Sequence, residues 1–448
     1  MLFTFQLALT EKIPGLFCHN FHIFVFTNQR DEMYSSVKAF TNVAIIFLFF
    51  LFNPANLQAG MQAGSYPGQD STDQFRFIQL KGHSGLGFYA DETPGEGFRS
   101  GFGSLDIRYG WQSSNPDNWQ SLYRYPAYGV GLFAGVSGHT ARLSRPSGVY
   151  GFISFPLRVS SGHVLAIEPA LGLSYDLKPA ESAIRPQNEV RGLRFDAYFN
   201  INLGGRYQLN PEIDLVYGFG LTHYSNGRTF RPNNGINILG ANIGLGYHFN
   251  AAARNNTGRQ TDTRPSYDHL AGPEELNPAG FNREESLLVY VAGGIVQNHA
   301  DRGTNKHYTT ASVILEYMHR FSFKHGASAG IALFYDPSLE YDFPEAKHHV
   351  YATHLGYDYH FWQMCFKIQA GTYIHKRGQD MKGSYFLRPA VQYTPANHLF
   401  LQLGLKTRAG FNADWIEFGL GFKLPVGFFA NGPKSQQVRH KSPGRFRQ

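Results

Sequence analysis

The sequence predicts an all-β fold: an antiparallel transmembrane β-barrel of eight strands, followed by a second repeat of eight strands. Three observations support this prediction. Stretches of about ten to fourteen residues alternate between bulky and small or polar side chains and end at turn residues. The composition combines 15% aromatic residues and 49 glycines with only 16% charged residues. The sequence also lacks the runs of about 18 apolar residues that a transmembrane helix needs.

The first repeat spans residues 75 to 250 and contains eight alternating stretches. Their length suits a tilted strand that crosses a membrane, which needs about 9 to 11 residues, better than the roughly 5 or 6 usual in soluble sheets. The eighth stretch ends in Tyr247, His248 and Phe249, which places aromatic side chains where an interfacial girdle lies. The predicted strands are 76–83, 102–111, 126–136, 149–159, 164–177, 195–209, 213–225 and 236–249.

A polar linker over residues 251–284 is followed by a second barrel-like repeat over residues 285–428. Two barrels of eight strands or one barrel of sixteen would both satisfy closure, and the long connector favours two. The repeat shows in residue spacing: Gln208, Pro211, Leu215, Gly220 and Leu221 recur as Gln392, Pro395, Leu399, Gly404 and Leu405. Its predicted strands are 286–298, 308–321, 326–335, 348–361, 364–375, 385–394, 398–408 and 414–426.

The N-terminal segment predicts export. The apolar run Val43–Phe52 has the length of a signal-peptide core and is too short to span a bilayer, and Leu57–Ala59 forms a plausible cleavage signature. We therefore expect translation to start at Met33, with residues 1–32 an upstream mis-start and residues 33–59 a signal peptide. An uncleaved anchor helix is the alternative.

Charge and cysteine usage say little about partners. Five of the seven net positive charges lie in a tail, residues 429–448, that holds no acidic residue and is predicted to be disordered. The basic balance therefore gives no reason to expect nucleic acid, and no glycine-rich phosphate loop supports nucleotide binding. The only cysteines are Cys18, in the predicted leader, and Cys365, so the mature chain would have no intrachain disulfide.

Polar side chains share one face at the end of the stretch 213–225. Its odd positions are bulky and its even positions small or polar, so the odd set is expected to face lipid. His223 and Ser225 continue the odd set. Asn237 has the outward parity of the next strand, and the loop between the two strands would bring it close to His223 and Ser225. Three polar groups then cluster on a lipid-facing wall, where unpaired polar groups are costly.

Such a cluster suits ester hydrolysis. A serine hydroxyl is a weak nucleophile until an adjacent imidazole takes its proton, and the imidazole works best when a third group fixes its tautomer. We interpret Ser225, His223 and Asn237 as a catalytic set, with Asn226 and the backbone amides beside Gly227 as oxyanion donors. A site open toward acyl chains predicts a lipid substrate. Alternatively, these residues only mark the membrane interface, because His-x-Ser is a short pattern.

The segment His223–Gly227, followed by Pro232–Gly235, resembles the lipid A 3-O-deacylase family of outer-membrane enzymes. Its His-x-Ser-Asn motif and Pro-Asn-x-Gly loop are closely similar to those of the family, and the barrel pattern extends the resemblance over roughly residues 75 to 250. The resemblance implies an eight-stranded barrel that removes the 3-position acyl chain of lipid A. Family members are single barrels, so residues 285–428 lie outside what it explains.

The resemblance implies Ser225 as nucleophile, His223 as base and Asn226 as oxyanion donor. The acidic member of the family's triad is a glutamate at the position of Asn237. An asparagine can orient the imidazole through its carbonyl but cannot offset an imidazolium charge. In the second repeat, Thr407 and Ala409 stand where His223 and Ser225 stand in the first, so that repeat could be purely structural.

The resulting prediction is an outer-membrane serine esterase acting on lipid A, lipopolysaccharide or a related glycolipid, with no cofactor and no metal. Nucleic acid is not an expected partner, and a homodimer is left open. The rival class is a pore or structural barrel in which both halves form one wide channel.

Two other sets of polar residues give weaker signals. His348, His354, Asp358 and His360 share one parity, and the last three could offer metal ligands, but we interpret them as a solvated lumen or rim face. We interpret Glu168 and Asp196 as solvated lumen or rim charges.

Overall fold

The computed structural model describes sixteen strands and one short 3-10 helix, η3 (Trp119–Tyr123). The predicted mis-start, signal peptide and tail, and most of the predicted linker, lie outside the described residues. The described ranges are 74–89, 100–113, 119–137, 146–160, 162–176, 195–229, 236–249, 281–298, 300–301, 304, 306–339, 348–374, 384–396, 398–408 and 412–426.

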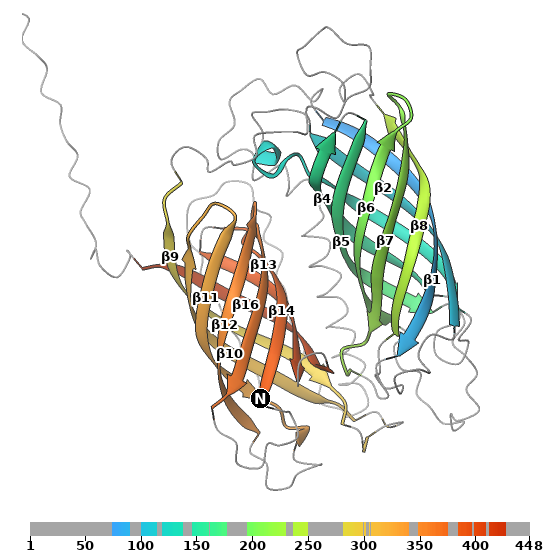
Figure 1. Ribbon diagram of the computed structural model, residues 1–448. Helices are drawn as coiled ribbons and strands as arrows, with labels where there is room; N and C mark the ends of the chain where they lie inside the picture. Colours follow the sequence, from blue (N-terminus) through green and yellow to red (C-terminus); the bar gives the residue numbers. More distant parts are fainter. Residues whose placement is uncertain are drawn as a thin grey trace, which may run out of the picture.

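The first eight strands form one closed antiparallel barrel (Figure 1). Each strand pairs with the next along the chain, and β1 pairs with β8 to close the sheet. The strands are β1 (Gln74–Tyr89), β2 (Ser100–Ser113), β3 (Ala127–Ser137), β4 (Pro146–Ser160), β5 (His163–Asp176), β6 (Phe195–Gln208), β7 (Ile213–Ser225) and β8 (Ile236–Phe249).

The last eight strands form a second closed barrel, sealed by pairing of β16 with β9. Of the two closures that the sequence allowed, two separate barrels are therefore correct and one barrel of sixteen strands is wrong. The strands are β9 (Glu284–Val296), β10 (Tyr308–Arg320), β11 (His325–Tyr335), β12 (His349–Phe361), β13 (Met364–Tyr373), β14 (Tyr385–Tyr393), β15 (Leu399–Arg408) and β16 (Asn412–Pro425).

Alternation along each strand separates an apolar outer wall from the lumen. In β7, Tyr217 and Phe219 are exposed, whereas Asp214 and Val216 are buried. Side chains two residues apart lie on the same face of a strand, so the large exposed residues form a continuous apolar surface. Exposed apolar patches of this extent mark contact with another apolar phase. None of the helical segments within the described ranges combines the length and the hydropathy that a membrane-spanning helix requires.

The lumen of the first barrel is filled by side chains. An aromatic cluster that includes Phe133, Tyr150 and Tyr198 packs across it. Glu168, which we expected to be solvated, is only 7% exposed and binds Lys81 at 3.2 Å and Arg108 at 3.1 Å. That expectation is wrong because a barrel of eight strands has no room for a water channel, so a luminal charge must find a counter-charge.

The lumen of the second barrel is built in the same way. Lys367 bridges Glu316 at 2.7 Å and Asp358 at 3.0 Å, and His354 bonds to Glu316 at 2.9 Å. His354, Asp358 and His360 are all at least nine-tenths buried. The solvated face that we expected for these residues is therefore wrong, because they are buried in the lumen of the second barrel.

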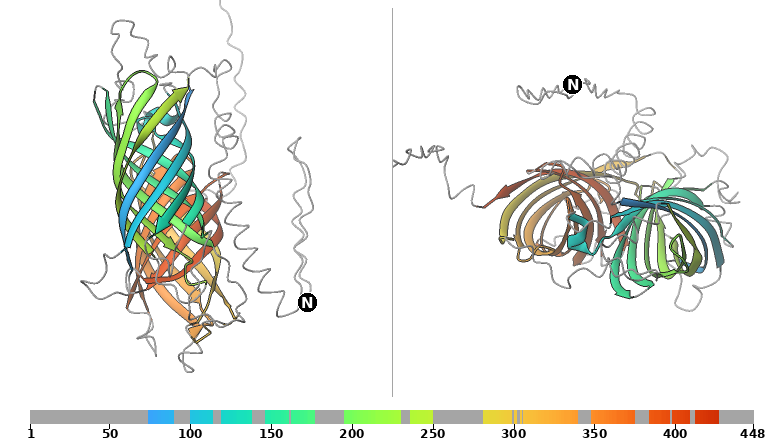
Figure 2. Two further views of the ribbon diagram at one scale, coloured as in Figure 1. Left: turned by 90° about the vertical axis from the view of Figure 1, so that its right-hand side faces the viewer. Right: turned by 90° about the horizontal axis from the view of Figure 1, so that it is seen from above.

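The two barrels lie side by side (Figures 1 and 2), and side chains join them at both ends. At one end, η3 packs on the turn between β12 and β13: Trp119 stacks on Trp362 and Tyr123 meets Phe361 edge-on. The Trp362 amide also donates to the Tyr123 hydroxyl at 2.9 Å. At the other end, the turn after β7 reaches the rim of the second barrel through Arg228.

Candidate functional site

His223 and Asn237 face each other directly across β7 and β8. Their side chains are hydrogen-bonded, with 2.8 Å between His223 Nδ1 and Asn237 Oδ1. An amide oxygen only accepts, so this bond requires the proton on Nδ1 and leaves Nε2 as a free base. The structure therefore brings together the two residues that alternation placed on one face. The pairing also gives the imidazole a defined tautomer and orientation.

Ser225 is the last residue of β7, two positions beyond His223 on the same face of the strand. Its side chain is more enclosed than an open outer wall implies, because the residue is only 8% exposed. The turn that follows folds back over it, and the Gly227 amide donates to Ser225 Oγ at 3.1 Å. The hydroxyl is thus held at a strand end beside a backbone donor.

Gly227 is required by the shape of this turn for two reasons. Its φ is +60°, in the left-handed region that favours glycine. A Cβ at this position would lie 2.4 Å from side-chain atoms of Ile416 on β16. The second barrel therefore packs directly against the backbone that carries the predicted oxyanion donor.

Asn226 lies between Ser225 and Gly227 and is partly buried. Among the described atoms, its Oδ1 is buried without a hydrogen-bond partner. Leaving a buried amide oxygen unpaired is unfavourable by about 1–3 kcal/mol, which points to a ligand-binding position. Half a turn about the last side-chain torsion would present the Nδ2 donor to an acceptor in the same place.

Arg228, which sequence reasoning missed, joins this turn to the second barrel. Its guanidinium is buried and donates to Asp414 Oδ1 at 3.0 Å and to Ser338 Oγ at 2.8 Å, with Asp336 Oδ2 at 3.5 Å. Its only sequence signal is its place directly after the motif. The partners lie more than one hundred residues away, where strand periodicity carries no information.

The second barrel does not repeat the site. The Thr407 hydroxyl is buried and bonds to the backbone of Leu387. Ala409 and the loop Pro232–Gly235 lie outside the described residues. A threonine hydroxyl at position 407 cannot act as the general base that His223 is predicted to supply in the first barrel.

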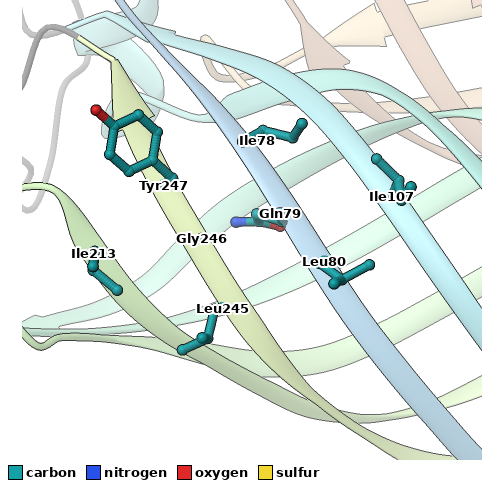
Figure 3. A pocket seen from close by; sticks show the side chains of 8 residues that line it. All are labelled: Ile78, Gln79, Leu80, Ile107, Ile213, Leu245, Gly246 and Tyr247. Carbon is teal, nitrogen blue, oxygen red and sulfur yellow. The ribbon is translucent and has the colours of Figure 1, made fainter.

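A shallow hollow on the outer wall of the first barrel lies away from this site (Figure 3). Ile78, Leu80, Ile107 and Leu245 surround it, and Ile213 at the start of β7 forms one edge. His223 lies ten residues further along the same strand, or roughly 33 Å at 3.3 Å per residue. The hollow is therefore a feature of the apolar wall and not part of the candidate site.

Comparison with known proteins places one family match in each barrel. Residues 105–246 match the family model described as lipid A 3-O-deacylase (PagL). Residues 285–426 match the model described as acyloxyacyl hydrolase, C-terminal domain. No curated protein matches the chain in sequence.

Solved structures similar to the chain include the outer-membrane enzyme PagL, at 14% identity and a TM-score of 0.27 over 37% of this chain and 97% of that one. The OccAB1 structure of Acinetobacter baumannii matches at 10% identity and a TM-score of 0.22, over 79% of this chain and 96% of that one. The OccK5 (OpdH) structure of Pseudomonas aeruginosa matches at 11% identity and a TM-score of 0.20, over 79% and 98%.

Proposed function

The chain belongs to the lipid A 3-O-deacylase family of outer-membrane acyl ester hydrolases, and from this premise we propose that it is a serine esterase that removes the 3-position acyl chain of lipid A or a related glycolipid. The reaction would take place where β7 ends and β8 begins, on the outer wall of the first barrel. The supporting observation is the 2.8 Å bond between His223 and Asn237, which frees Nε2 to act as a base on the side of the strand that carries Ser225.

In the proposed reaction, Ser225 Oγ attacks the ester carbonyl carbon and its proton passes to Nε2 of His223. Asn237 holds the imidazole by accepting from Nδ1–H. The oxyanion that forms is stabilised by donors at Asn226 and Gly227. When the tetrahedral intermediate collapses, the bond between the carbonyl carbon and the sugar oxygen breaks. The sugar oxygen takes the proton from Nε2 of His223. Water then attacks the acyl-serine while His223 takes its proton. His223 returns that proton to Ser225 Oγ as the fatty acid leaves.

The proposed substrate follows from the surroundings of the site. The exposed residues of β7 that precede His223 on its face are apolar, including Tyr217 and Phe219. Acyl chains in a membrane could lie along this face without losing an apolar environment. The ester linkage near the sugar would then lie near the strand end, where the wall becomes polar.

The test is mass spectrometry of lipid A from cells that express the wild-type chain or Ser225→Ala. We expect the wild type to produce lipid A lighter by one acyl chain and Ser225→Ala to leave it intact. Ser84→Ala is the matched control, because Ser84 is an exposed serine on β1 of the same barrel and should leave activity unchanged. Identical lipid A in cells with and without the wild-type chain would refute the proposal. A homodimer, which the sequence leaves open, is a separate question, answered by the mass of the purified protein in detergent.

A further inference from the structure

We propose that the second barrel acts as a rigid support for the catalytic turn of the first, with Arg228 as the positioning residue. This inference rests on the proposed function and deepens it, because it gives the second repeat a part in that function. Arg228 touches no reacting atom in the proposal. It acts through the turn that carries Ser225, Asn226 and Gly227.

The side-chain contacts of Arg228 are those of a buried anchor. The residue is 4% exposed, and both carboxylates that it reaches, Asp336 and Asp414, are fully buried. Asp414 is also bound by Lys406 of the second barrel at 2.7 Å. The second barrel thus offers a prearranged acidic site, and a guanidinium fills it better than a point charge because its fork reaches several acceptors.

The second barrel also holds the backbone of the turn at Arg228. The Gln297 amide, just after β9, donates to the Arg228 carbonyl oxygen at 2.9 Å. Arg228 has a φ of +68°, in the left-handed region, which is unfavourable for a non-glycine residue. Such strain persists only where surrounding contacts hold it, and here most of the holding groups belong to the second barrel.

This arrangement predicts a specific kinetic signature. Losing the anchor would leave the His223–Asn237 pair intact on its two strands, but would release the turn that positions Ser225 Oγ and the oxyanion donors. Lipid binding along the outer wall would be unchanged. Misplacement of reacting groups by about 1 Å can lower a rate about 10²-fold. The loss should therefore fall on kcat and not on KM.

The experiment compares Arg228→Met with Arg388→Met in the full-length protein. Arg388 is also a buried arginine paired with a carboxylate, Glu417, but it lies inside the second barrel. We expect Arg228→Met to lower kcat about 10²-fold with KM unchanged, Arg228→Lys to recover part of the loss, and Arg388→Met to lower stability with kcat retained. Equal kcat values for Arg228→Met and the wild type would overturn the inference.

A second readout does not depend on activity. Spin labels on Thr229→Cys and Lys306→Cys report the distance between the turn and the rim of the second barrel. We expect a narrow distance distribution that becomes broad in Arg228→Met. A narrow distance distribution in both the wild type and Arg228→Met would overturn the anchoring role of Arg228, even if the enzyme were inactive. A wild type that is inactive but has a narrow distribution, broadened in Arg228→Met, would count against the proposed function alone.

A separate observation concerns the lumen of the second barrel. Ligand atoms of Asp358, His360 and Cys365 lie within 4.8 Å of one another. His360 and Cys365 are paired across β12 and β13, and Gln392 is paired with Cys365 across β13 and β14. All four side chains are at least nine-tenths buried.

Three of these residues hold polar atoms that lack a hydrogen-bond partner among the described atoms: Asp358 Oδ2, His360 Nε2 and Gln392 Oε1. The fourth, Cys365, is a free thiol. Lys367 occupies only the other oxygen of Asp358, and Glu316 balances its charge. Buried acceptors without partners on neighbouring strands, two of them on residues whose ligand atoms lie within 4.8 Å of one another, indicate a missing cation or water.

We propose that this cluster binds a divalent ion of the zinc class. Carboxylate, imidazole and thiolate ligands suit Zn²⁺, with Gln392 Oε1 as the fourth ligand. Ligand atoms of a tetrahedral zinc site lie roughly 3.3–3.8 Å apart, so the side chains must close in by about 1 Å. The Cys365 thiol would lose its proton to solvent on binding.

The test is calorimetric titration of the metal-free full-length protein with Zn²⁺, followed by Cd²⁺ titration for thiolate absorption. We expect one equivalent to bind, with at least a tenfold loss of affinity in Cys365→Ser and in His360→Gln. His354→Gln is the matched control, because His354 lies on the same strand but already bonds to Glu316. Absence of binding, or binding unchanged in both ligand variants, would overturn the proposal.

Discussion

Replacing Asn237 by aspartate should make the proposed enzyme faster. The substitution preserves the side-chain shape, so a carboxylate oxygen would take the place of Oδ1, 2.8 Å from His223 Nδ1. A neutral acceptor holds the imidazole but gives little stabilisation to the imidazolium that forms when Ser225 transfers its proton. A carboxylate would provide that stabilisation, as the acidic member of a triad does.

The expected size follows from the change in hydrogen-bond type. A neutral hydrogen bond contributes about 0.5–1.5 kcal/mol and one to a charged group about 1.5–3 kcal/mol. The difference, about 1–2 kcal/mol in the transition state, corresponds to roughly 5- to 30-fold in kcat. The Coulomb attraction between the imidazolium and the new carboxylate is about 4 kcal/mol at 4 Å with an effective dielectric constant of 20, and this value is the upper limit of the stabilisation.

The assay is single-turnover deacylation of purified lipid A in detergent, read by mass spectrometry. Asn237→Leu should be slower than the wild type because nothing then orients the imidazole. Asn242→Asp is the matched control: Asn242 lies on the same strand but faces the lumen, where it bonds to Asn202 at 2.7 Å, so its change should not raise kcat. If Asn237→Asp folded normally and were no faster than the wild type, Asn237 would not be the orienting residue.

Three further predictions follow from the packing. Gly227→Ala should lower activity about 10²-fold while both barrels still fold, and Ile416→Ala in the same protein should restore part of it by relieving the 2.4 Å clash. Glu168→Gln should destabilise the first barrel by about 3–5 kcal/mol, because buried Lys81 loses its salt-bridge partner and Arg108 keeps only one of its two carboxylates, Asp106, and thermal unfolding should show this. In planar bilayers the protein should give no stable conductance steps, because side chains fill both lumens.

Alternation in the sequence predicted the strands closely. The range 213–225 is the observed range of β7, and 236–249 is that of β8. The first strand is longer than its predicted range of 76–83, since β1 extends from Gln74 to Tyr89 through small residues that blur the alternation. Two adjacent strands whose outward faces are known can pair in only a few registers. The proximity of His223 and Asn237 could therefore also be predicted.

What the sequence could not supply depends on contacts between distant parts of the chain. Closure of each barrel requires β1 to meet β8 and β9 to meet β16, and no local pattern encodes which ends join. The partners of Glu168 and Arg228 lie on other strands or in the other barrel, so their burial could not be predicted from parity. The enclosure of Ser225 likewise depends on how the turn folds back over it.

Because each sheet closes on itself, the two barrels of this chain can change in sequence independently during evolution. A sealed cylinder exposes no free strand edge, so two copies joined in one gene remain neighbours instead of merging. A wider pore would require both seams to open at once, with the loss of many backbone hydrogen bonds in a medium that offers no replacement. Each copy can therefore diverge without endangering the architecture of the other, as the threonine at position 407 illustrates.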